Sequence, residues 1–288
     1  MIDFLRFRKF FFIFSGILTG FGLISFILKG KDNFGIDFMG GTMLHLKFEK
    51  QLNEADINSI RKKIEASKIR ASIQYFGGEK KELIVKAKGV QEDVSLKIRE
   101  IIETIGDFEY SSEYIGPSVS RDLVSLAIKA VIIAIIAMLI YIAIRFEFRF
   151  GISAVIALIH DITFVLGIYS LTGCEFNVPT IAAFLTVVGY SINDTIVVFD
   201  RIRENLKLLR REDYYIIVNK SINQVLPRTI ITSLTTLFVC SALLIFAGGE
   251  VSKFALVLVV GVIIGTYSSD CVASPILYEW HKRSQVKK

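Results

Sequence analysis

The sequence predicts an α-helical polytopic membrane protein, with six transmembrane helices and a small α+β ferredoxin-like extracytoplasmic domain. Three observations predict this fold class. The 288 residues are 52% hydrophobic, and apolar residues gather in nearly uncharged runs of about 20, the length that spans a bilayer core. Lys and Arg are unevenly distributed among the segments that join these runs. The segment between the first two runs instead has the periodicities of a soluble domain.

Six apolar runs are long enough to cross a membrane. The first, Phe10–Leu28, follows Arg6, Arg8 and Lys9, as the apolar part of a signal peptide would. Its 19 residues and the lack of a small-residue cleavage site favour an uncleaved signal anchor. The spans are expected at residues 10–28, 123–144, 151–171, 178–200, 229–247 and 254–278.

The positive charges predict the orientation of these spans. Sixteen Lys and Arg residues lie at the two termini and in segments 145–150 and 201–228, whereas segments 172–177 and 248–253 contain only Lys253. Because short cytoplasmic loops carry the excess of positive charge, both termini are expected in the cytoplasm. This bias accounts for the net charge of +6 without a nucleic-acid partner.

The residues between the first two spans, 31–122, are then expected outside the cytoplasm. They include 15 basic and 16 acidic residues and are numerous enough for one small domain. Asn53 is expected to cap the first helix, Gly77–Gly78 to form a hairpin turn, and Gly106 to end the second helix. The predicted βαββαβ order, the ferredoxin-like split pattern, has strands at 42–48, 69–76, 82–88 and 108–114 and helices at 53–67 and 92–105.

Three domains are therefore expected along the chain. Residues 1–30 form the N-terminal segment and first span, and residues 31–122 form the extracytoplasmic domain. Residues 123–288 form a five-helix bundle with a cytoplasmic loop, 201–228, and a cytoplasmic tail.

A glycine-rich segment, Gly35–Thr42, directly follows the first span. Gly35, Gly40 and Gly41 permit unusual backbone conformations or close approach, and Asp37 between them can accept hydrogen bonds from free backbone N–H groups. We expect a rigid turn that couples the first span to the first strand. Direct contact with a partner protein is the alternative.

No catalytic constellation is visible in the outer domain, which is therefore interpreted as a contact surface for another protein. The chain has no nucleophile–base pair, no Gly-rich phosphate loop before a helix and no Cys/His spacing typical of a metal site. Neither an enzyme, a cofactor nor a metal is expected. The cysteines, Cys174, Cys240 and Cys271, are expected to be free thiols.

Ionisable groups at membrane depth are costly and by default functional, and Asp161, Asp194, Asp200 and Asp270 qualify. Asp194 precedes Arg201 by seven residues, which places it about 10 Å inside the cytoplasmic boundary. Burial disfavours a charged carboxylate, so such a group can exchange a proton at ordinary pH. We predict a proton-linked role for Asp194, with an ion pair that fixes helix packing as the alternative. The expected surrounding polar residues are Tyr190, Ser191, Asn193 and Thr195.

His160 and Asp161 are adjacent in the third span. Neighbouring helical positions point about 100° apart, so the two side chains are not expected to form one site. A proton pathway and simple helix packing both remain open for them. Asp200, near Arg203 and Glu204, is interpreted as part of a charge cluster at the membrane interface.

Arg228 begins a stretch with five hydroxyl residues that favours an interior helix face. Its side chain can extend to the cytoplasmic surface or pair with Asp194, and we favour the pair. The spacing of Gly261 and Gly265, and of Gly16 and Gly20, is typical of close helix packing, within the chain or with another subunit.

Several motifs, in one order along nearly the whole chain, resemble those of the SecD/SecF family of translocase subunits. The outer domain is short, like that of the smaller of the family's two subunits. Asp270 departs from the family, which usually has an apolar residue there. The matching motifs are Gly35–Thr42, ALIHDITFVLG at 157–167, GYSINDTIVVFDRIREN at 189–205, RTIITSLTTL at 228–237, and Gly265–Ser269 with Ala273–Pro275.

The resemblance implies the fold of one half of a resistance-nodulation-division (RND) exporter. It also implies a proton-driven accessory role in late protein export through the Sec channel of the bacterial inner membrane. The implied partners are SecD, the SecYEG channel, often YajC, and the translocating polypeptide. Carried over by motif, the proton-linked residues are Asp194 and Arg228, with Asp161 as a further candidate. His160 is a candidate from its own chemistry, because histidine can carry protons near neutral pH. The expected supporting residues are Asn193, Tyr190 and Thr232, and the expected coupling motif contains Gly35, Asp37, Gly40 and Gly41.

Two other functional classes remain open at this point. An RND-type small-molecule or lipid exporter subunit would move its cargo through the protein itself. A purely structural scaffold would contain buried acids without any proton chemistry.

Overall fold

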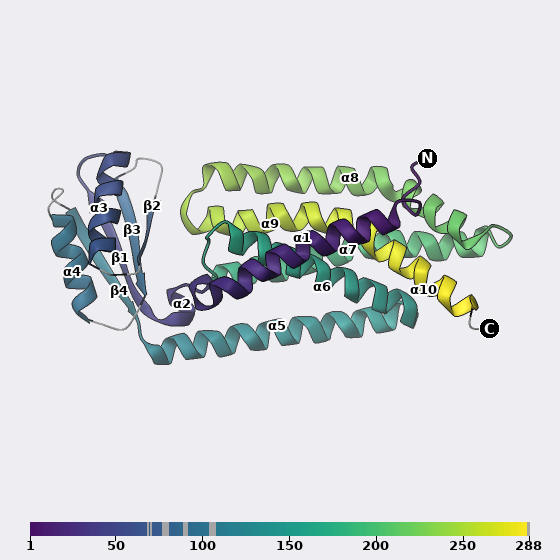
Figure 1. Cartoon of the computed structure of the whole chain (residues 1–288), viewed down its shortest axis with the longest axis horizontal. Helices are drawn as coiled ribbons and strands as arrows, with labels where there is room; N and C mark the ends of the chain where they lie inside the picture. Colours follow the sequence, from purple (N-terminus) through teal and green to yellow (C-terminus); the bar gives the residue numbers. More distant parts are fainter. Residues whose placement is uncertain (68, 70, 77–80, 89–91, 104–107, 287–288) are drawn as a thin grey trace.

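A bundle of long helices carries a small α+β unit at one end, and both chain termini lie at the other end (Figure 1). This computed structural model describes residues 1–67, 69, 71–76, 81–88, 92–103 and 108–286. Within these residues, six helices are long and apolar enough to cross a membrane. The predicted fold class is therefore confirmed.

The long helices coincide with the apolar runs, extended by polar turns at their ends. Helix α9 continues through a π-helical turn, Ser269–Ala273, into α10. The helices are α1 (Arg8–Lys29), α5 (Pro117–Arg145), α6 (Phe148–Leu171), α7 (Val178–Leu208), α8 (Tyr214–Phe246), α9 (Gly249–Ser268) and α10 (Ser274–Val286).

The segment 201–228, expected as a loop, is helical except at residues 209–213. Asp213 caps the start of α8 by accepting a hydrogen bond from the Tyr215 N–H at 2.8 Å. Asn205 on α7 donates to the Ser221 hydroxyl on α8 at 2.8 Å, and both residues are buried. The two helices therefore continue as a packed hairpin beyond the apolar runs. Buried apolar residues such as Ile202, Val218 and Ile222 pack beside this polar contact.

Helix α1 crosses α6 at two glycines. A Cβ atom added to Gly22 would lie 2.7 Å from the Gly167 Cα atom, so the backbones touch here. Gly16 and Gly20 have nothing within 4 Å of such an atom, so this pair does not pack within the chain. Gly261 and Gly265 do pack within the chain, because α9 lies against α7 at these two residues.

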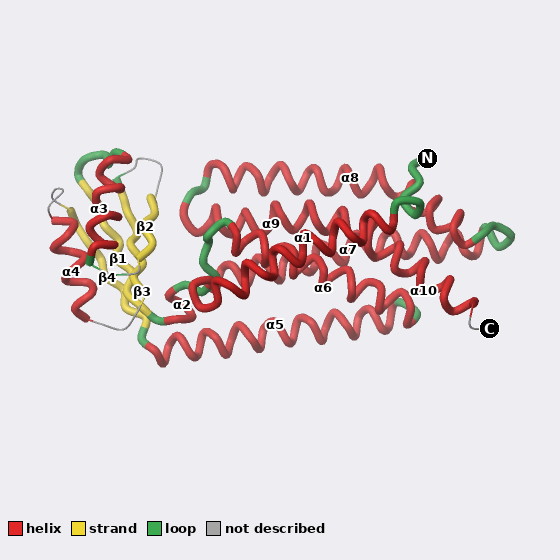
Figure 2. Tube along the Cα trace, in the orientation of Figure 1, coloured by secondary structure: helices red, strands yellow, loops and turns green. Residues whose placement is uncertain are grey.

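The outer unit is a four-stranded antiparallel sheet in the order β2-β3-β1-β4, and the predicted βαββαβ order is observed. Figure 2 shows the two helices on the side of the sheet away from the bundle. Asn53 caps α3 as expected, accepting from the Asp56 N–H at 2.9 Å. The expected turns at Gly77–Gly78 and Gly106 lie outside the described residues. The elements are β1 (Gly41–Phe48), α3 (Glu54–Ala66), β2 (Ala71–Phe76), β3 (Glu82–Lys88), α4 (Glu92–Glu103) and β4 (Phe108–Ile115).

Alternation along the central strands separates an apolar face from a polar one. Leu44 and Leu46 of β1 and Val85 of β3 point toward α3 and α4 and are buried. Lys86 points the other way, and its Nζ lies 2.8 Å from a carboxylate oxygen of Glu250 at the start of α9. The polar face of the sheet is therefore tied to the membrane bundle.

Candidate functional site

Asp161 on α6 is the most completely bonded buried acid of the bundle. Its side chain is 0% exposed. One carboxylate oxygen accepts from Ser191 of α7 at 2.5 Å and from Ser268 of α9 at 2.6 Å. The other lies 2.8 Å from His160 Nδ1. Asp161 therefore connects three helices through short hydrogen bonds.

The expectation that His160 and Asp161 do not form one site is wrong. Nδ1 is the ring nitrogen nearest the backbone, and it lies 2.8 Å from the neighbouring carboxylate. The other ring nitrogen, Nε2, is buried and has no hydrogen-bond partner among the described residues. The helical angle alone did not predict this contact, since it describes Cβ directions and not side-chain torsions.

Asp194 on α7 is equally buried but held far more loosely. It is 3% exposed. Its Oδ2 atom lies 3.5 Å from the Ser233 hydroxyl of α8 and 3.5 Å from the Thr266 hydroxyl of α9. These two hydroxyls lie only 2.6 Å from each other. Since 3.5 Å is the outer limit of a hydrogen bond, Asp194 has a polar environment that does not fix its carboxyl group.

The expected polar neighbours of Asp194 are only partly placed around it. Tyr190 reaches it indirectly, by donating to the Ser233 hydroxyl at 3.3 Å. Ser191 bonds Asp161 instead, and Thr195 bonds the Ser191 carbonyl of its own helix. Asn193 is exposed.

Arg228 does not form the favoured pair with Asp194. Its side chain is exposed, and no ion pair within 4.0 Å joins it to Asp194 in the described chain. Ser233, five residues later on α8, takes the position against Asp194. Five residues correspond to about 7.5 Å along a helix and about 140° around it, so Arg228 and Ser233 project from different faces of α8. Arg228 still interacts electrostatically with Asp194 without forming an ion pair. Thr232 is also exposed and donates to carbonyl groups of its own helix, those of Arg228 and Thr229.

Asp270 lies in the π-helical turn, beside Asp194. It is 4% exposed, its Oδ1 atom has no hydrogen-bond partner among the described residues, and it interacts electrostatically with Asp194. π-Helical turns occur often at functional sites.

The hydroxyl partners of the buried acids were not predicted as site residues. Hydroxyl residues within apolar runs were the visible signal that could have identified them. These partners are Ser233, Thr266 and Ser268.

The fourth acid, Asp200, lies at the end of the bundle that carries the termini. Its carboxylate oxygens lie 2.6 Å from Arg145 and 3.8 Å from Arg203. This ion-pair cluster at the helix ends is the predicted arrangement.

The glycine-rich segment forms a short helix, α2 (Ile36–Met39), that contacts several other elements. Asp37 accepts a hydrogen bond from the Val178 N–H, the first residue of α7, at 2.9 Å. Its carbonyl accepts from the Ser120 hydroxyl of α5 at 2.9 Å. The segment therefore joins the membrane helices directly.

The glycines of this segment allow these close contacts. A Cβ atom on Gly35 would lie 1.8 Å from the Asn177 side chain, just before α7. Gly40 has a φ of 76°, which ends α2, and Gly41 lies against the Ala87 carbonyl of β3. The geometry supports the rigid turn that the sequence predicts.

Among the described residues, no group of three His, Cys, Asp or Glu side chains could hold a metal ion. The three cysteines are free, and Cys240 and Cys271 are buried. The polar constellation of the bundle consists of carboxylates, hydroxyls and the His160 imidazole, which can exchange or relay protons.

Comparison with known proteins identifies the family. Residues 97–283 match the family described as protein export membrane protein SecD/SecF, C-terminal. The chain belongs to the SecD/SecF family. Its membership confirms the expected multi-pass membrane protein of protein export, an accessory component and not an enzyme.

Individual SecD/SecF proteins match over almost the full chain. The protein translocase subunit SecF of Calditerrivibrio nitroreducens is 45% identical, over 96% of this chain and 93% of that protein. The protein translocase subunit SecF of Rickettsia prowazekii is 38% identical, over 99% of this chain and 93% of that protein. The crystal structure of SecDF from Thermus thermophilus, a translocon-associated membrane protein, is 38% identical with a TM-score of 0.83. The match covers 98% of this chain but only 39% of that SecDF chain.

Proposed function

We propose that the chain is a SecF-type accessory subunit that uses the proton-motive force to promote late steps of protein export. The names of its SecF relatives support this role. The match to a solved SecDF chain, of which this chain covers 39%, supports SecD as its partner. This complex acts on a polypeptide that leaves the SecYEG channel, with YajC as a further component.

The proposed location is the bacterial cytoplasmic (inner) membrane. Both termini lie at one end of the bundle, together with the α7–α8 hairpin and its Lys and Arg residues (Figure 1). The excess of positive charge assigns this end to the cytoplasm. The sheet, within residues 31–122, then lies outside.

The loosely held carboxyl group of Asp194 is the observation that carries the mechanism. When charged, it accepts hydrogen bonds from Ser233 and Thr266; when protonated, it becomes a donor to one of them. Two buried acids, Asp194 and Asp270, also disfavour simultaneous ionisation of both groups. Proton exchange at Asp194 therefore changes how α7, α8 and α9 pack.

The energy available from one proton is sufficient for such a change. One charge that moves through 100 mV releases about 2.3 kcal/mol. This biases a two-state equilibrium by roughly 50-fold. Asp161, in contrast, fixes the packing of α6, α7 and α9 because its bonds are short and complete.

Exposed polar residues on α7 and α8 mark the proposed contact with SecD. Arg228, Asn193 and Thr232 lie on the surface of these two helices. A guanidinium group beside lipid is costly, so a partner with a matching acid is the favourable neighbour for Arg228. The Asp194 carboxyl then lies close to the subunit contact.

The change in the packing of α7, α8 and α9 is transmitted to the outer sheet through the glycine-rich segment. Asp37 holds the first residue of α7, and the chain continues from Gly41 directly into β1. At one edge of the sheet, β4 pairs only with β1 among the described strands, and most of its side chains are exposed. An unpaired strand edge can bind an extended polypeptide by strand addition.

Asp194→Asn in a reconstituted complex with SecD and SecYEG tests the mechanism. We expect proton-gradient stimulation of export to be lost while the complex still assembles, since the amide keeps the shape of the side chain but cannot exchange the proton. Asp200→Asn, on the same helix but at the membrane surface, is the matched control and should retain stimulation. Normal gradient dependence of Asp194→Asn would refute proton coupling, and loss of assembly in both variants would favour a scaffold.

A further inference from the structure

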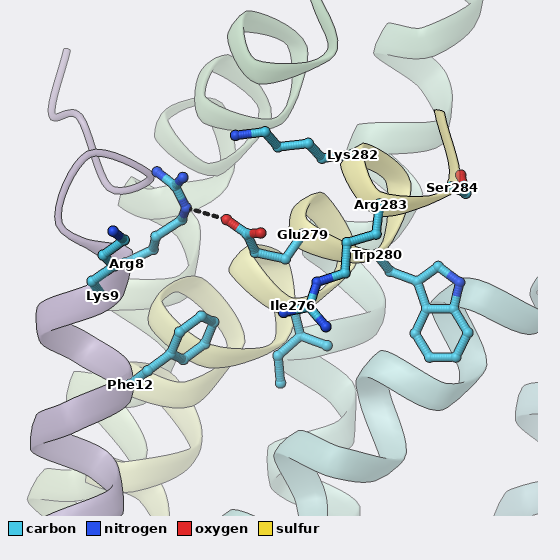
Figure 3. A pocket seen from close by; sticks show the side chains of 9 residues that line it. All are labelled: Arg8, Lys9, Phe12, Ile276, Glu279, Trp280, Lys282, Arg283 and Ser284. Atoms are coloured by element: carbon cyan, nitrogen blue, oxygen red, sulfur yellow. Dashed lines mark hydrogen bonds and ion pairs between the residues drawn. The ribbon is translucent and has the colours of Figure 1, made fainter. Parts of the chain in front are cut away.

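A cavity of about 1000 Å³ opens between the start of α1 and the last helix, α10 (Figure 3). It lies at the end of the bundle where the apolar run of α1 begins, and therefore at a membrane–water boundary. None of the roles proposed above uses it. Its lining residues are Arg8, Lys9, Phe12, Ile276, Glu279, Trp280, Lys282, Arg283 and Ser284.

The charges around the cavity are unbalanced. Its lining has four cationic side chains and one carboxylate. Arg8 already pairs with that carboxylate, since its Nε atom lies 2.5 Å from Glu279 Oε1. Lys9, Lys282 and Arg283 are exposed and have no ion pair or side-chain hydrogen bond in the described part of the chain. Three positive charges are therefore left without an acidic partner.

The inner part of the cavity is apolar and aromatic. Phe12 of α1 and Ile276 of α10 lie on the membrane side of the Arg8–Glu279 pair, and Arg283 extends toward Ile276 (Figure 3). Trp280, the only tryptophan of the chain, lines the same cavity and contacts Phe148 edge to face, with ring centroids 6.4 Å apart. Tryptophan is enriched at membrane–water interfaces because its ring is apolar and its N–H is polar.

We propose that this cavity binds the headgroup of an anionic phospholipid from the adjoining leaflet. Lys9, Lys282 and Arg283 surround the lipid phosphate, and the first acyl carbons lie along Phe12 and Ile276. Basic pockets between membrane helices bind anionic headgroups in this way. A volume of about 1000 Å³ suits a headgroup with its adjoining carbons far better than a free phosphate ion. The bound lipid joins the first and last membrane helices of the chain.

The single tryptophan provides a direct measurement. The full chain is reconstituted in phosphatidylcholine vesicles that contain increasing fractions of brominated phosphatidylglycerol, whose bromine atoms quench a tryptophan in contact with them. Brominated phosphatidylcholine serves as the reference lipid. From the three unpaired charges we expect Trp280 to prefer phosphatidylglycerol on the order of a hundredfold.

A matched pair of triple variants separates the cavity from general surface charge. Lys9→Gln, Lys282→Gln and Arg283→Gln together should reduce the preference to about one. Lys207→Gln, Arg210→Gln and Arg211→Gln remove the same charge from exposed positions at the same end of the bundle and should leave it unchanged. Equal quenching of all proteins by brominated phosphatidylcholine shows that Trp280 keeps its place.

Three results would overturn the proposal. Wild-type protein without a preference for phosphatidylglycerol would show that the cavity does not select anionic lipid. Equal loss of the phosphatidylglycerol preference in both triple variants would show that general surface charge, and not the cavity, causes the preference. Displacement by excess sodium phosphate, at constant ionic strength, would identify a site for free phosphate and not for a lipid.

Discussion

The carboxylate of Asp37 accepts a hydrogen bond from the backbone N–H of Val178 at 2.9 Å, across 141 residues of sequence. The free N–H groups and the dipole at a helix start favour a negative charge there. Asp194 lies 16 residues further along the same helix, about 24 Å away. One helix therefore links the glycine-rich segment to the loosely held buried acid.

Replacing Asp37 tests this link. Asp37→Ala removes the acceptor at the start of α7, so we expect about 1 kcal/mol of lost stability and weaker gradient stimulation of export. Thermal unfolding of the purified protein and the reconstituted export assay measure the two effects. Asp122→Ala, an exposed acid at the start of α5, is the control. Equal stability of both variants would exclude an anchoring role for Asp37.

Asp161 should matter for folding more than for proton coupling. Asp161→Ala leaves the Ser191 hydroxyl and His160 without their acceptor, whereas the Ser268 hydroxyl keeps the Gly265 carbonyl at 3.2 Å. Buried donors without partners cost about 1–3 kcal/mol each, so a lower unfolding temperature and poor yield are expected. Thr163→Ala, on the exposed side of α6, should behave like wild type because its hydroxyl bonds only its own helix. A stable Asp161→Ala protein would show that the network does not hold the bundle together.

The α1–α6 crossing should tolerate no side chain. Gly22→Val or Gly167→Val forces the two backbones apart, since a Cβ on either glycine lies within 2.7 Å of the other's Cα. Overpacking of this kind costs about 1–3 kcal/mol, which thermal unfolding in detergent would detect. Gly20→Val, two residues away with open space around it, should leave the unfolding temperature unchanged. Similar melting of all three variants would contradict the close crossing.

The ion pair between Lys86 and Glu250 should couple the sheet to the bundle. The Lys86 side chain is only 7% exposed, and Glu250 also accepts from Asn177 at 3.1 Å. A double-mutant cycle with Lys86→Gln and Glu250→Gln, measured by unfolding, should give a coupling energy of about 1–2 kcal/mol. Additive effects of the two changes would mean that the contact contributes nothing.

The order of the elements could be predicted because each element carries its own periodicity. Alternation of apolar and polar residues predicted the strands, and apolar residues at helical spacing predicted α3 and α4. Asn53 predicted the start of α3, which the structure confirms. The six spans followed from length and apolar content alone. These features depend on neighbours in the sequence.

The contacts of the buried acids could not be predicted in the same way. Asp161 meets Ser191 and Ser268 from helices far along the chain, so its partners depend on how each helix is rotated about its axis. The same rotation brings Ser233, and not Arg228, within hydrogen-bond distance of Asp194. A sequence shows which polar residues lie at membrane depth, but the helix rotations decide which of them meet.

The π-helical turn at Ser269–Ala273 has a further effect on the last membrane helix. It contains one residue more than an α-helical turn, and one residue corresponds to about 100° of rotation. Removal of a single residue from this turn would therefore swing the Glu279 side chain to another azimuth, away from Arg8 of α1. One extra residue thus determines which way the positively charged end of the chain faces.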